Sequence, residues 1–175
     1  MDNIIYKTEN IDLSGADIQR ITLNKCNIIT YDDLQYITDI GQLLGEYNAV
    51  IILYTTSKNY GHFCSLMLKG GILEFFDPYG YNVDEELKII DNLHLRKDGI
   101  TNTPHLTYLI QTSNYKFTYN KLQLQEEEAH VNTCGRWAAL RVRLREYNLN
   151  TFIKLMTNNK FYNGDFWVSA LTLLL

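Results

Sequence analysis

Three short segments of the sequence carry residues that could together perform nucleophilic chemistry. They are Gly61-His62-Phe63, the run from Phe75 to Gly80 that contains Asp77, and the run from Thr133 to Trp137 that contains Cys134. An imidazole can take the proton of a thiol, and a carboxylate on the other ring nitrogen fixes the tautomer of that imidazole. These residue types predict a cysteine nucleophile, Cys134, with His62 as its base and Asp77 as the group that orients the base.

The residues around His62 and Asp77 predict a β-hairpin. The ranges His62 to Lys69 and Ile72 to Phe76 have strand patterns, and the Gly70-Gly71 pair between them suits a tight turn. Counted from that turn, antiparallel pairing places His62 and Asp77 within a residue or two of each other. The hairpin itself is therefore expected to build the His-Asp pair.

The cysteine lies where a helix is expected to begin. Apolar spacing is helical from Cys134 to about Asn148, and Thr133 is a plausible N-cap. In the first turn of a helix the dipole and the free N–H groups favour a thiolate. Arg136, Arg141, Arg143 and Arg145 are expected on a solvated side of this helix, in preference to a DNA-binding patch.

The other segments complete the expected fold. The patterns predict a buried strand over Ala49 to Thr56, helices capped by Ser14 and by Thr30 or Asp32, a helix over Asp84 to Leu93, strands over Leu106 to Gln111 and Tyr115 to Leu124, and helices over Thr151 to Met156 and Asp165 to Leu175. Together they predict an α+β fold: a mixed central sheet of about five strands flanked by helices, with Cys134 at the N-terminus of a central helix. Since there is no linker or repeat, residues 1–175 are expected to form one domain.

Composition limits the class of protein. A chain of 175 residues, 46% of them hydrophobic, can bury one substantial core. Three cysteines and a polar start predict a soluble protein that is not secreted and whose thiols are reduced. The longest apolar stretch near the C-terminus, Phe166 to Leu175, is shorter than the ~20 residues of a membrane-spanning helix. The net charge of −4 gives no broad basic footprint for nucleic acid.

Other thiols and histidines offer weaker candidates. Cys64 could flank the site on the His62 face of its strand, although a packed core cysteine is favoured, and Cys26 has no partner in sequence. His130 is expected to be exposed. A zinc site from His62, Cys64, His130 and Cys134 would need paired ligand spacings that are absent, so neither a metal nor a cofactor is expected.

The order of these motifs resembles the adenovirus maturation protease and its Ulp1-type relatives. A Gly-His-aromatic strand, an apolar strand ending in Asp-Pro-aromatic-Gly, a Gln-bearing strand and Cys-Gly at a helix start follow one another over most of the chain. The segments Leu13 to Ile18 and Asn132 to Arg136 are most similar to the capsid maturation proteases of virophages, Maverick/Polinton elements and large DNA viruses.

The resemblance implies an oxyanion hole made by a glutamine and the backbone N–H of Cys134. The candidates are Gln125 and, as the alternative, Gln123. Glu126, Glu127 and Glu128 lengthen the usual interval between this glutamine and the cysteine, and they are expected to point into solvent, since inward-facing carboxylates would disfavour a thiolate.

The resemblance also implies the activity, a cysteine endopeptidase that trims capsid or core proteins and cuts near small residues such as glycine. A monomer in the virion and in the viral factory of the host-cell cytoplasm is expected, without a membrane partner and with a possible activating peptide or DNA. The alternatives are an isopeptidase that removes a ubiquitin-like modifier and a non-catalytic interaction domain with the same fold.

Overall fold

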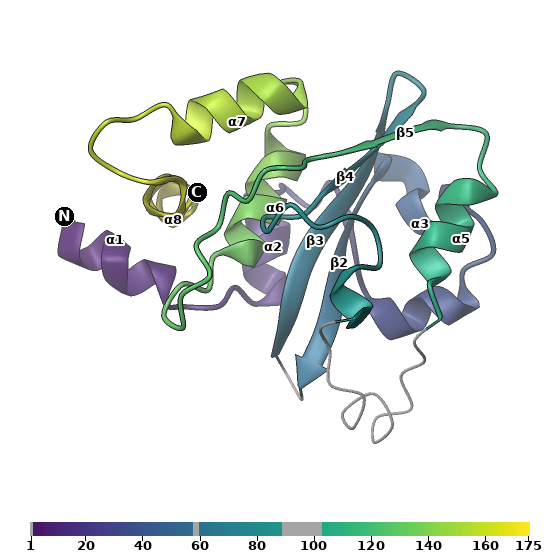
Figure 1. Cartoon of the computed structure of the whole chain (residues 1–175), viewed down its shortest axis with the longest axis horizontal. Helices are drawn as coiled ribbons and strands as arrows, with labels where there is room; N and C mark the ends of the chain where they lie inside the picture. Colours follow the sequence, from purple (N-terminus) through teal and green to yellow (C-terminus); the bar gives the residue numbers. More distant parts are fainter. Residues whose placement is uncertain (1, 58–59, 89–102) are drawn as a thin grey trace.

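A five-stranded mixed sheet forms the centre of the molecule (Figure 1). The computed structural model describes residues 2–57, 60–88 and 103–175. The strands lie across the sheet in chain order: β1 (Asn27–Thr30), β2 (Ala49–Ser57), β3 (Tyr60–Lys69), β4 (Ile72–Phe76) and β5 (Lys116–Tyr119). β2, β3 and β4 pair antiparallel, whereas β1 on β2 and β5 on β4 are parallel. The predicted α+β fold with a five-stranded mixed sheet is confirmed.

Helices cover both faces of the sheet (Figure 1). One face carries α2 (Gly15–Ile21), α6 (Cys134–Arg143), α7 (Leu149–Thr157) and α8 (Gly164–Leu174), with α1 (Asp2–Glu9) packed beside α8. The other face carries the 3-10 helix η1 (Tyr31–Tyr36), α3 (Ile40–Leu44) and α5 (His105–Gln111). Two single 3-10 turns, η2 (Gly45–Tyr47) and η3 (Glu86–Lys88), lie in connections. None of the helices in the described part of the chain is both long and apolar enough to span a membrane.

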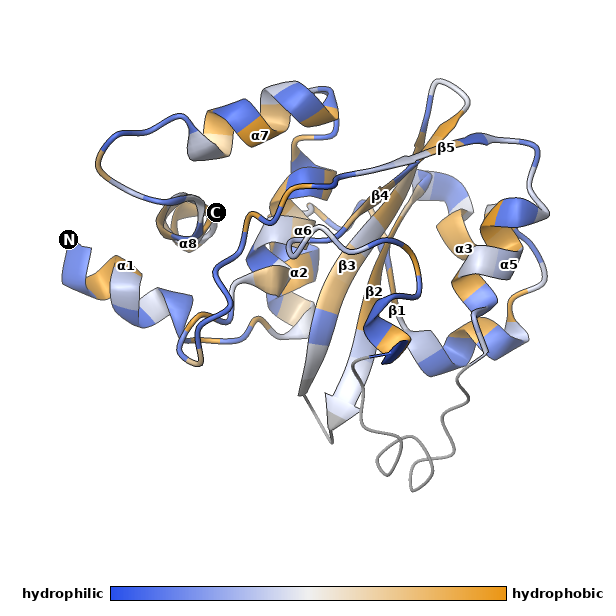
Figure 2. Ribbon diagram, viewed as in Figure 1, coloured by the Kyte–Doolittle hydropathy of each residue, from blue (hydrophilic) through white to orange (hydrophobic). Residues whose placement is uncertain are grey.

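The alternation of side chains along β2 explains why both layers form. Val50, Ile52 and Tyr54 point into the core with η1, α3 and α5, whereas Ala49 and Ile51 point into the core with α6. Figure 2 shows the hydrophobic colour of the strands where they lie between the helical layers. Burial on both faces, which the continuous apolar run predicted, is confirmed.

Several predicted elements are present with shifted ends. Ser14 caps α2 with a full capping box, in which its hydroxyl accepts from the Asp17 N–H at 3.2 Å and its own N–H donates to Asp17 Oδ2 at 3.1 Å. The segment after Thr30 is a 3-10 helix, η1. α6 is shorter than predicted, because the side chain of Arg141 donates to the carbonyls of Leu144 and Tyr147, and the chain turns there.

Other predictions were wrong or incomplete. The predicted strand over Leu106 to Gln111 is the helix α5, whose buried Leu106, Leu109 and Ile110 follow i, i+3, i+4 spacing. β1 was not predicted. β5 ends at Tyr119, before the expected end of that strand. Of the helix predicted over Asp84 to Leu93, only η3 forms among the described residues, and 89–93 lie outside them.

Two arginines of α6 are buried, which corrects the expectation of a solvated basic side. Arg136 is 4% exposed and donates to Thr172 Oγ1 on α8 and to backbone carbonyls at the end of α1. Arg141 is 1% exposed and binds Glu74 of β4 with both ends of its guanidinium. Helix α6 is enclosed by β3, α2 and α8, and the two buried charges are tolerated because Arg141 pairs with Glu74 of β4 and Arg136 donates to α8 and to carbonyls at and after the end of α1. They are not available for DNA.

Glu9, at the end of α1, is a buried acid that makes stability depend on pH. Burial, together with the charges of Asp165 and Glu126, raises its pKa to about 7, and its Oε1 atom has no hydrogen-bond partner. The unfolded chain therefore loses this proton at lower pH than the folded chain, so stability falls as pH rises from about 4.5 to about 7 and then levels off.

Glu9→Gln is expected to remove that loss. The melting temperature should rise relative to wild type above pH 7 and should match it at about pH 3, because the Glu9 carboxyl is then protonated in both the folded and the unfolded chain. Thermal denaturation at the two pH values tests this, with the exposed Glu146→Gln as a matched control. Equal gains at both pH values would show that the carboxyl does not titrate in this window.

Candidate active site

The β3–β4 hairpin places His62 against Asp77. Gly70 and Gly71 form the turn with φ of 57° and 77°, values that glycine adopts without strain. In the resulting register Ser65 pairs with Phe76, so Asp77 follows the last paired residue of β4. The Nε2 atom of His62 is 2.9 Å from Oδ1 of Asp77, and both side chains are almost completely buried. The expected hairpin and the proximity of the two residues are confirmed.

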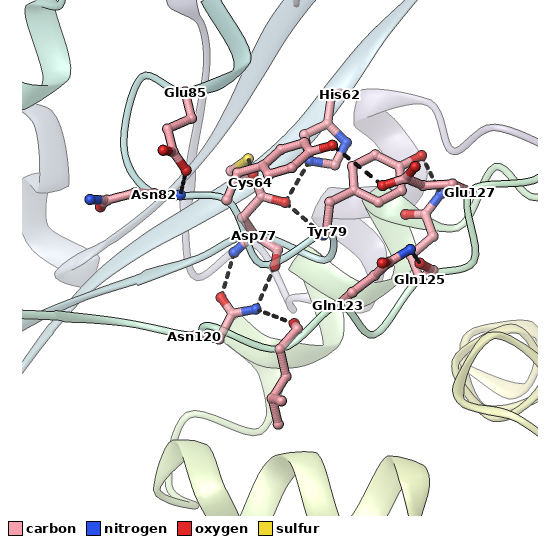
Figure 3. A network of polar contacts seen from close by, with 12 residues as sticks. His62, Cys64, Asp77, Tyr79, Asn82, Glu85, Asn120, Gln123, Gln125 and Glu127 are labelled. Carbon is pink, nitrogen blue, oxygen red and sulfur yellow. Dashed lines mark hydrogen bonds and ion pairs between the residues drawn. The ribbon is translucent and has the colours of Figure 1, made fainter.

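Hydrogen bonds hold both the carboxylate and the backbone of Asp77 (Figure 3). Its Oδ1 accepts from the Tyr79 N–H at 2.7 Å and its Oδ2 from the Cys64 thiol at 3.3 Å. Asn120 clamps its backbone, since Oδ1 of Asn120 accepts from the Asp77 N–H at 2.8 Å and Nδ2 donates to the Asp77 carbonyl at 2.5 Å. A buried amide at the end of β5 therefore fixes where the carboxylate points.

Asn120→Ala is expected to lower turnover more than it weakens substrate binding. The variant leaves the backbone N–H of Asp77 unpaired, which costs about 1–3 kcal/mol for a buried group, and leaves its carbonyl with the Gly80 N–H alone, so the carboxylate can move. Asn120→Asp is the matched variant, because it keeps the acceptor for the Asp77 N–H but loses the donor to its carbonyl. Steady-state kinetics test the prediction. An unchanged kcat in a folded Asn120→Ala protein would show that the clamp does not position Asp77.

Cys134 is the first residue of α6, and its position is fixed from α8. The hydroxyl of Thr133 does not cap the helix but donates to Oδ1 of Asp165, which also accepts from Nε1 of Trp137 at 2.8 Å. The other oxygen, Oδ2, accepts from the Glu126 N–H at 2.9 Å. One buried carboxylate thus joins the start of α6, the preceding loop and α8. Cys134 remains partly exposed.

His62 lies between this thiol and Asp77. Burial lowers the pKa of His62. The charge of Cys64 and the hydrogen bonds with Asp77, Cys134 and Cys64 raise this pKa by more, so it lies well above its ordinary value. Tyr79 stacks on the imidazole with ring centroids 4.7 Å apart. Burial raises the pKa of Tyr79 to about 12, so this phenol keeps its proton. The histidine is therefore fixed at its nitrogen by Asp77 and on its face by Tyr79.

Gln125 is buried beside these residues, and Gln123 is exposed. The side-chain amide of Gln125 donates to the Val131 carbonyl at 3.0 Å. It also donates to the Tyr79 hydroxyl at 3.2 Å, a contact drawn in Figure 3. Gln123 donates to the carbonyl of Gln125 at 3.1 Å. The hydrogen bonds of Gln125 connect it through Tyr79 to His62, whereas Gln123 has no such connection.

The acidic residues that follow are exposed, as predicted. Glu126 accepts from Asn163 at 2.9 Å, Glu127 from the Tyr81 hydroxyl at 3.3 Å, and Glu128 pairs with His130 at 3.1 Å. His130 is exposed in this loop, so the set His62, Cys64, His130 and Cys134 is not brought together. Among the described residues, three potential metal ligands do meet: the ligand atoms of His62, Cys64 and Asp77 lie within 4.8 Å of one another.

A pocket of about 250 Å³ opens beside Cys134. Its wall combines the N-terminal segment with β2, β3 and the start of α6, and includes Leu13, Gly15, Leu53, Gly61, Phe63 and Gly135. A Cβ on Gly135 would lie 3.3 Å from the Phe63 ring and 3.4 Å from Leu13, so the pocket is already tightly lined at the thiol. The segment Leu13 to Ile18, part of the sequence resemblance, therefore contributes to the surroundings of Cys134.

Sequence reasoning missed three residues of this site. Asn120 and Asp165 act over 43 and 32 residues of sequence, on Asp77 and Thr133 respectively, and no local pattern marks such partners. Tyr79 was noted only as the aromatic residue of the Asp-Pro-aromatic-Gly motif. Its position two residues after Asp77, opposite His62 in the extended hairpin register, is the signal that could have identified it.

Comparison with known proteins places the chain by fold and by sequence. No model of a known protein family matches it. The arrangement of sheet and helices is similar to that of the ASFV pS273R protease, which matches with a TM-score of 0.50 at 12% identity, over 95% of this chain and 68% of that chain. The SUMO protease Ulp1 matches with a TM-score of 0.38 at 9% identity, over 93% and 78%.

Sequence similarity identifies a relative among the virophages. Protein V9 of Sputnik virophage, itself uncharacterized, is 35% identical over 147 residues, which is 83% of this chain and 83% of that protein. The chain belongs to the family of this virophage protein. The resemblance to a virophage protein is thereby confirmed, and the expected fold is that of a viral protease.

Proposed function

We propose that the protein is a cysteine endopeptidase with Cys134 as nucleophile, His62 as general base and Asp77 as the group that orients His62. The observation that carries this proposal is the buried His62, which is 2.9 Å from Asp77 through Nε2 and also contacts the partly exposed thiol of Cys134. The fold shared with a viral protease supports a protease-family function. A protease in turn implies a protein substrate.

The geometry supports a simple sequence of steps. His62 takes the thiol proton of Cys134, and the raised pKa of His62 stabilises the resulting imidazolium beside the thiolate. The thiolate attacks the scissile carbonyl, and the imidazolium gives its proton to the leaving amine. Water, activated by the neutral imidazole, then releases the acyl group from Cys134. Asp77 keeps its orienting contact throughout, because its own backbone is clamped by Asn120.

The oxyanion of this reaction is assigned to the backbone N–H of Cys134 and the side chain of Gln125. Gln125 is favoured over Gln123 because it is buried next to Tyr79. Both of its amide hydrogens have partners in the resting site, so donation to the oxyanion replaces the longer contact, that to the Tyr79 hydroxyl. The phenol remains packed on His62 during this exchange.

The substrate proposed is a capsid or core protein of the virus, cut near small residues such as glycine. The narrow, glycine-containing pocket beside Cys134 supports this preference, since Phe63 and Leu13 leave little room next to the thiol. The proposed enzyme works as a monomeric single domain in the virion and in the viral factory. An activating peptide or DNA is a testable addition to this scheme, and no metal or cofactor takes part in the reaction itself.

The pH dependence of iodoacetamide labelling tests the site without a known substrate. Each cysteine is followed by mass spectrometry in wild type and in His62→Ala. Cys134 alone is expected to react quickly at about pH 6 and to lose this advantage without His62, because the imidazole no longer holds its proton. Cys26 and Cys64, both buried, are the internal controls.

The contrary result is equally clear. If Cys134 in the folded protein labels like an ordinary thiol, which reacts mainly above about pH 8, and His62→Ala makes no difference, the proposed base does not act on it. Adding candidate activating peptide or DNA to the same assay then shows whether a partner assembles the site. Without any such effect, the proposal of a cysteine endopeptidase is rejected.

A further inference from the structure

Three residues with different metal-binding groups meet at the His62–Asp77 pair: an imidazole, a carboxylate and the thiol of Cys64. Nε2 of His62 is 2.9 Å from Oδ1 of Asp77, and Sγ of Cys64 is 3.3 Å from Oδ2 of the same carboxylate. Taking one ligand atom from each residue, the nitrogen, the sulfur and a carboxylate oxygen lie within 4.8 Å of one another. All three residues are buried. The proposed mechanism uses His62 and Asp77 but leaves the Cys64 thiol without a role.

These atoms approach the arrangement of a zinc site. Zinc takes imidazole nitrogen and carboxylate oxygen at about 2.0–2.2 Å and thiolate sulfur at about 2.3 Å, so tetrahedral angles separate nitrogen from oxygen by about 3.3 Å and oxygen from sulfur by about 3.6 Å. The two observed separations are shorter than these by a few tenths of an ångström and end on different oxygens of Asp77, so an ion bound through one oxygen also requires a rotation of the carboxylate. If one ion replaced the protons of the two hydrogen bonds, the ligand atoms would have to move apart by these few tenths of an ångström.

A fourth group stands beside this cluster. Glu86 is 7% exposed, and its Oε2 atom has no hydrogen-bond partner. Its charge acts on His62, Cys64 and Asp77, and burial together with the charge of Asp77 raises its pKa. A buried carboxyl oxygen without a partner, within electrostatic reach of a histidine, a thiol and a second carboxyl, is an environment that a divalent cation would satisfy.

We propose that His62 Nε2, Cys64 Sγ and the Asp77 carboxylate form a binding site for a zinc-like divalent ion, with Glu86 as an outer or fourth ligand, and that the bound ion inhibits the enzyme. Binding releases the Cys64 thiol proton to solvent. The ion takes the place of the proton on Nε2, which also goes to solvent if the imidazole is charged, so the metal-bound imidazole carries its one proton on Nδ1 and cannot accept the proton of Cys134. The inhibitory consequence rests on the proposed function, whereas the binding itself does not.

Cobalt(II) titration of the reduced, full-length protein tests the site by spectrum. A thiolate ligand gives a thiolate-to-cobalt charge-transfer band in the ultraviolet, and stoichiometric zinc abolishes it by displacement. The band is expected in wild type, in Cys26→Ser and in Cys134→Ser. Cys64→Ser keeps a donor for Asp77 but loses the soft ligand, so the band should disappear. Glu86→Gln should weaken cobalt binding by about tenfold, as loss of an outer partner does.

The cysteine variants also give the results that would overturn the proposal. A band that survives in folded Cys64→Ser and disappears in Cys134→Ser places the ion on the nucleophile, and the absence of any band in folded wild type means that there is no site. The Cys134→Ser result stands even if Cys64→Ser does not fold.

The inhibitory consequence is measured separately. Zinc is expected to slow Cys134 labelling several-fold in wild type and in Cys26→Ser but not in Cys64→Ser, each compared with the same variant without zinc. Equal slowing in folded Cys64→Ser contradicts the proposal. The cobalt spectrum tests the metal site. The effect of His62→Ala on Cys134 labelling without metal tests the proposed function, so one of the two proposals can fail without the other.

Discussion

Cys134→Ser and His62→Ala are each expected to lower peptide hydrolysis by about 10⁴-fold or more, because the two residues act as one unit. For the same reason the double variant should be no slower than either single variant by more than a small factor. Cleavage of a peptide library that contains Gly-Gly-X sequences, read by mass spectrometry, measures the loss. Cys26→Ser, which changes a buried thiol packed against α2, is the matched control.

Strict additivity would contradict the shared mechanism. If the losses in Cys134→Ser and His62→Ala multiplied in the double variant, each residue would act on its own, and the general-base role of His62 would be wrong. Hydrolysis retained by Cys134→Ser would remove the nucleophile from its proposed role.

Arg141→Ala is expected to destabilise the folded protein by about 3–5 kcal/mol. The guanidinium binds Glu74 at 2.7 and 3.2 Å, donates to two backbone carbonyls and lies 5.2 Å from the centroid of the Phe152 ring. Its removal leaves the carboxylate of Glu74 without its cation in a largely buried place between β4 and α6. Urea denaturation measures the change.

Two further variants separate the ion pair from simple packing. Arg141→Met combined with Glu74→Leu should recover much of the loss, since neither charge then needs a partner. The exposed pair of Arg20 and Asp17, at 3.6 Å, is the control, and Arg20→Ala should change stability by less than about 1 kcal/mol. Equal effects of Arg141→Ala and Arg20→Ala would show that burial adds nothing to the Glu74 pair.

The sequence predicted the parts of the site that depend on local geometry. The Gly70-Gly71 turn and strand alternation are enough to bring His62 to Asp77, because the register of a hairpin follows from its turn. The start of α6 at Cys134 followed from apolar spacing and was likewise correct. Each of these inferences uses residues close together in the chain.

The remaining parts depend on partners that are distant in sequence. Whether Arg141 is solvated or buried depends on Glu74, 67 residues away, and the helical period of α6 contains no information about it. The side chain of Asn120 binds the backbone of Asp77, which is 43 residues earlier in the sequence. Asn120 does not continue the strand, and β5 therefore ends earlier than predicted. The helix α5 was a different error, since its spacing of buried residues was present in the sequence and was misinterpreted.

The distances in sequence between the proposed catalytic groups order the assembly of the enzyme. His62 and Asp77 are 15 residues apart and meet when a single hairpin closes, a fast local event. The thiol is 134 − 62 = 72 residues from the base, and its helix start is fixed only when α8 docks through Asp165. Closing such long loops is entropically unfavourable until much of the core has formed. In a partly folded copy the proposed base is thus formed before the proposed nucleophile is in place, so the proposed activity is expected only after the last helix has docked.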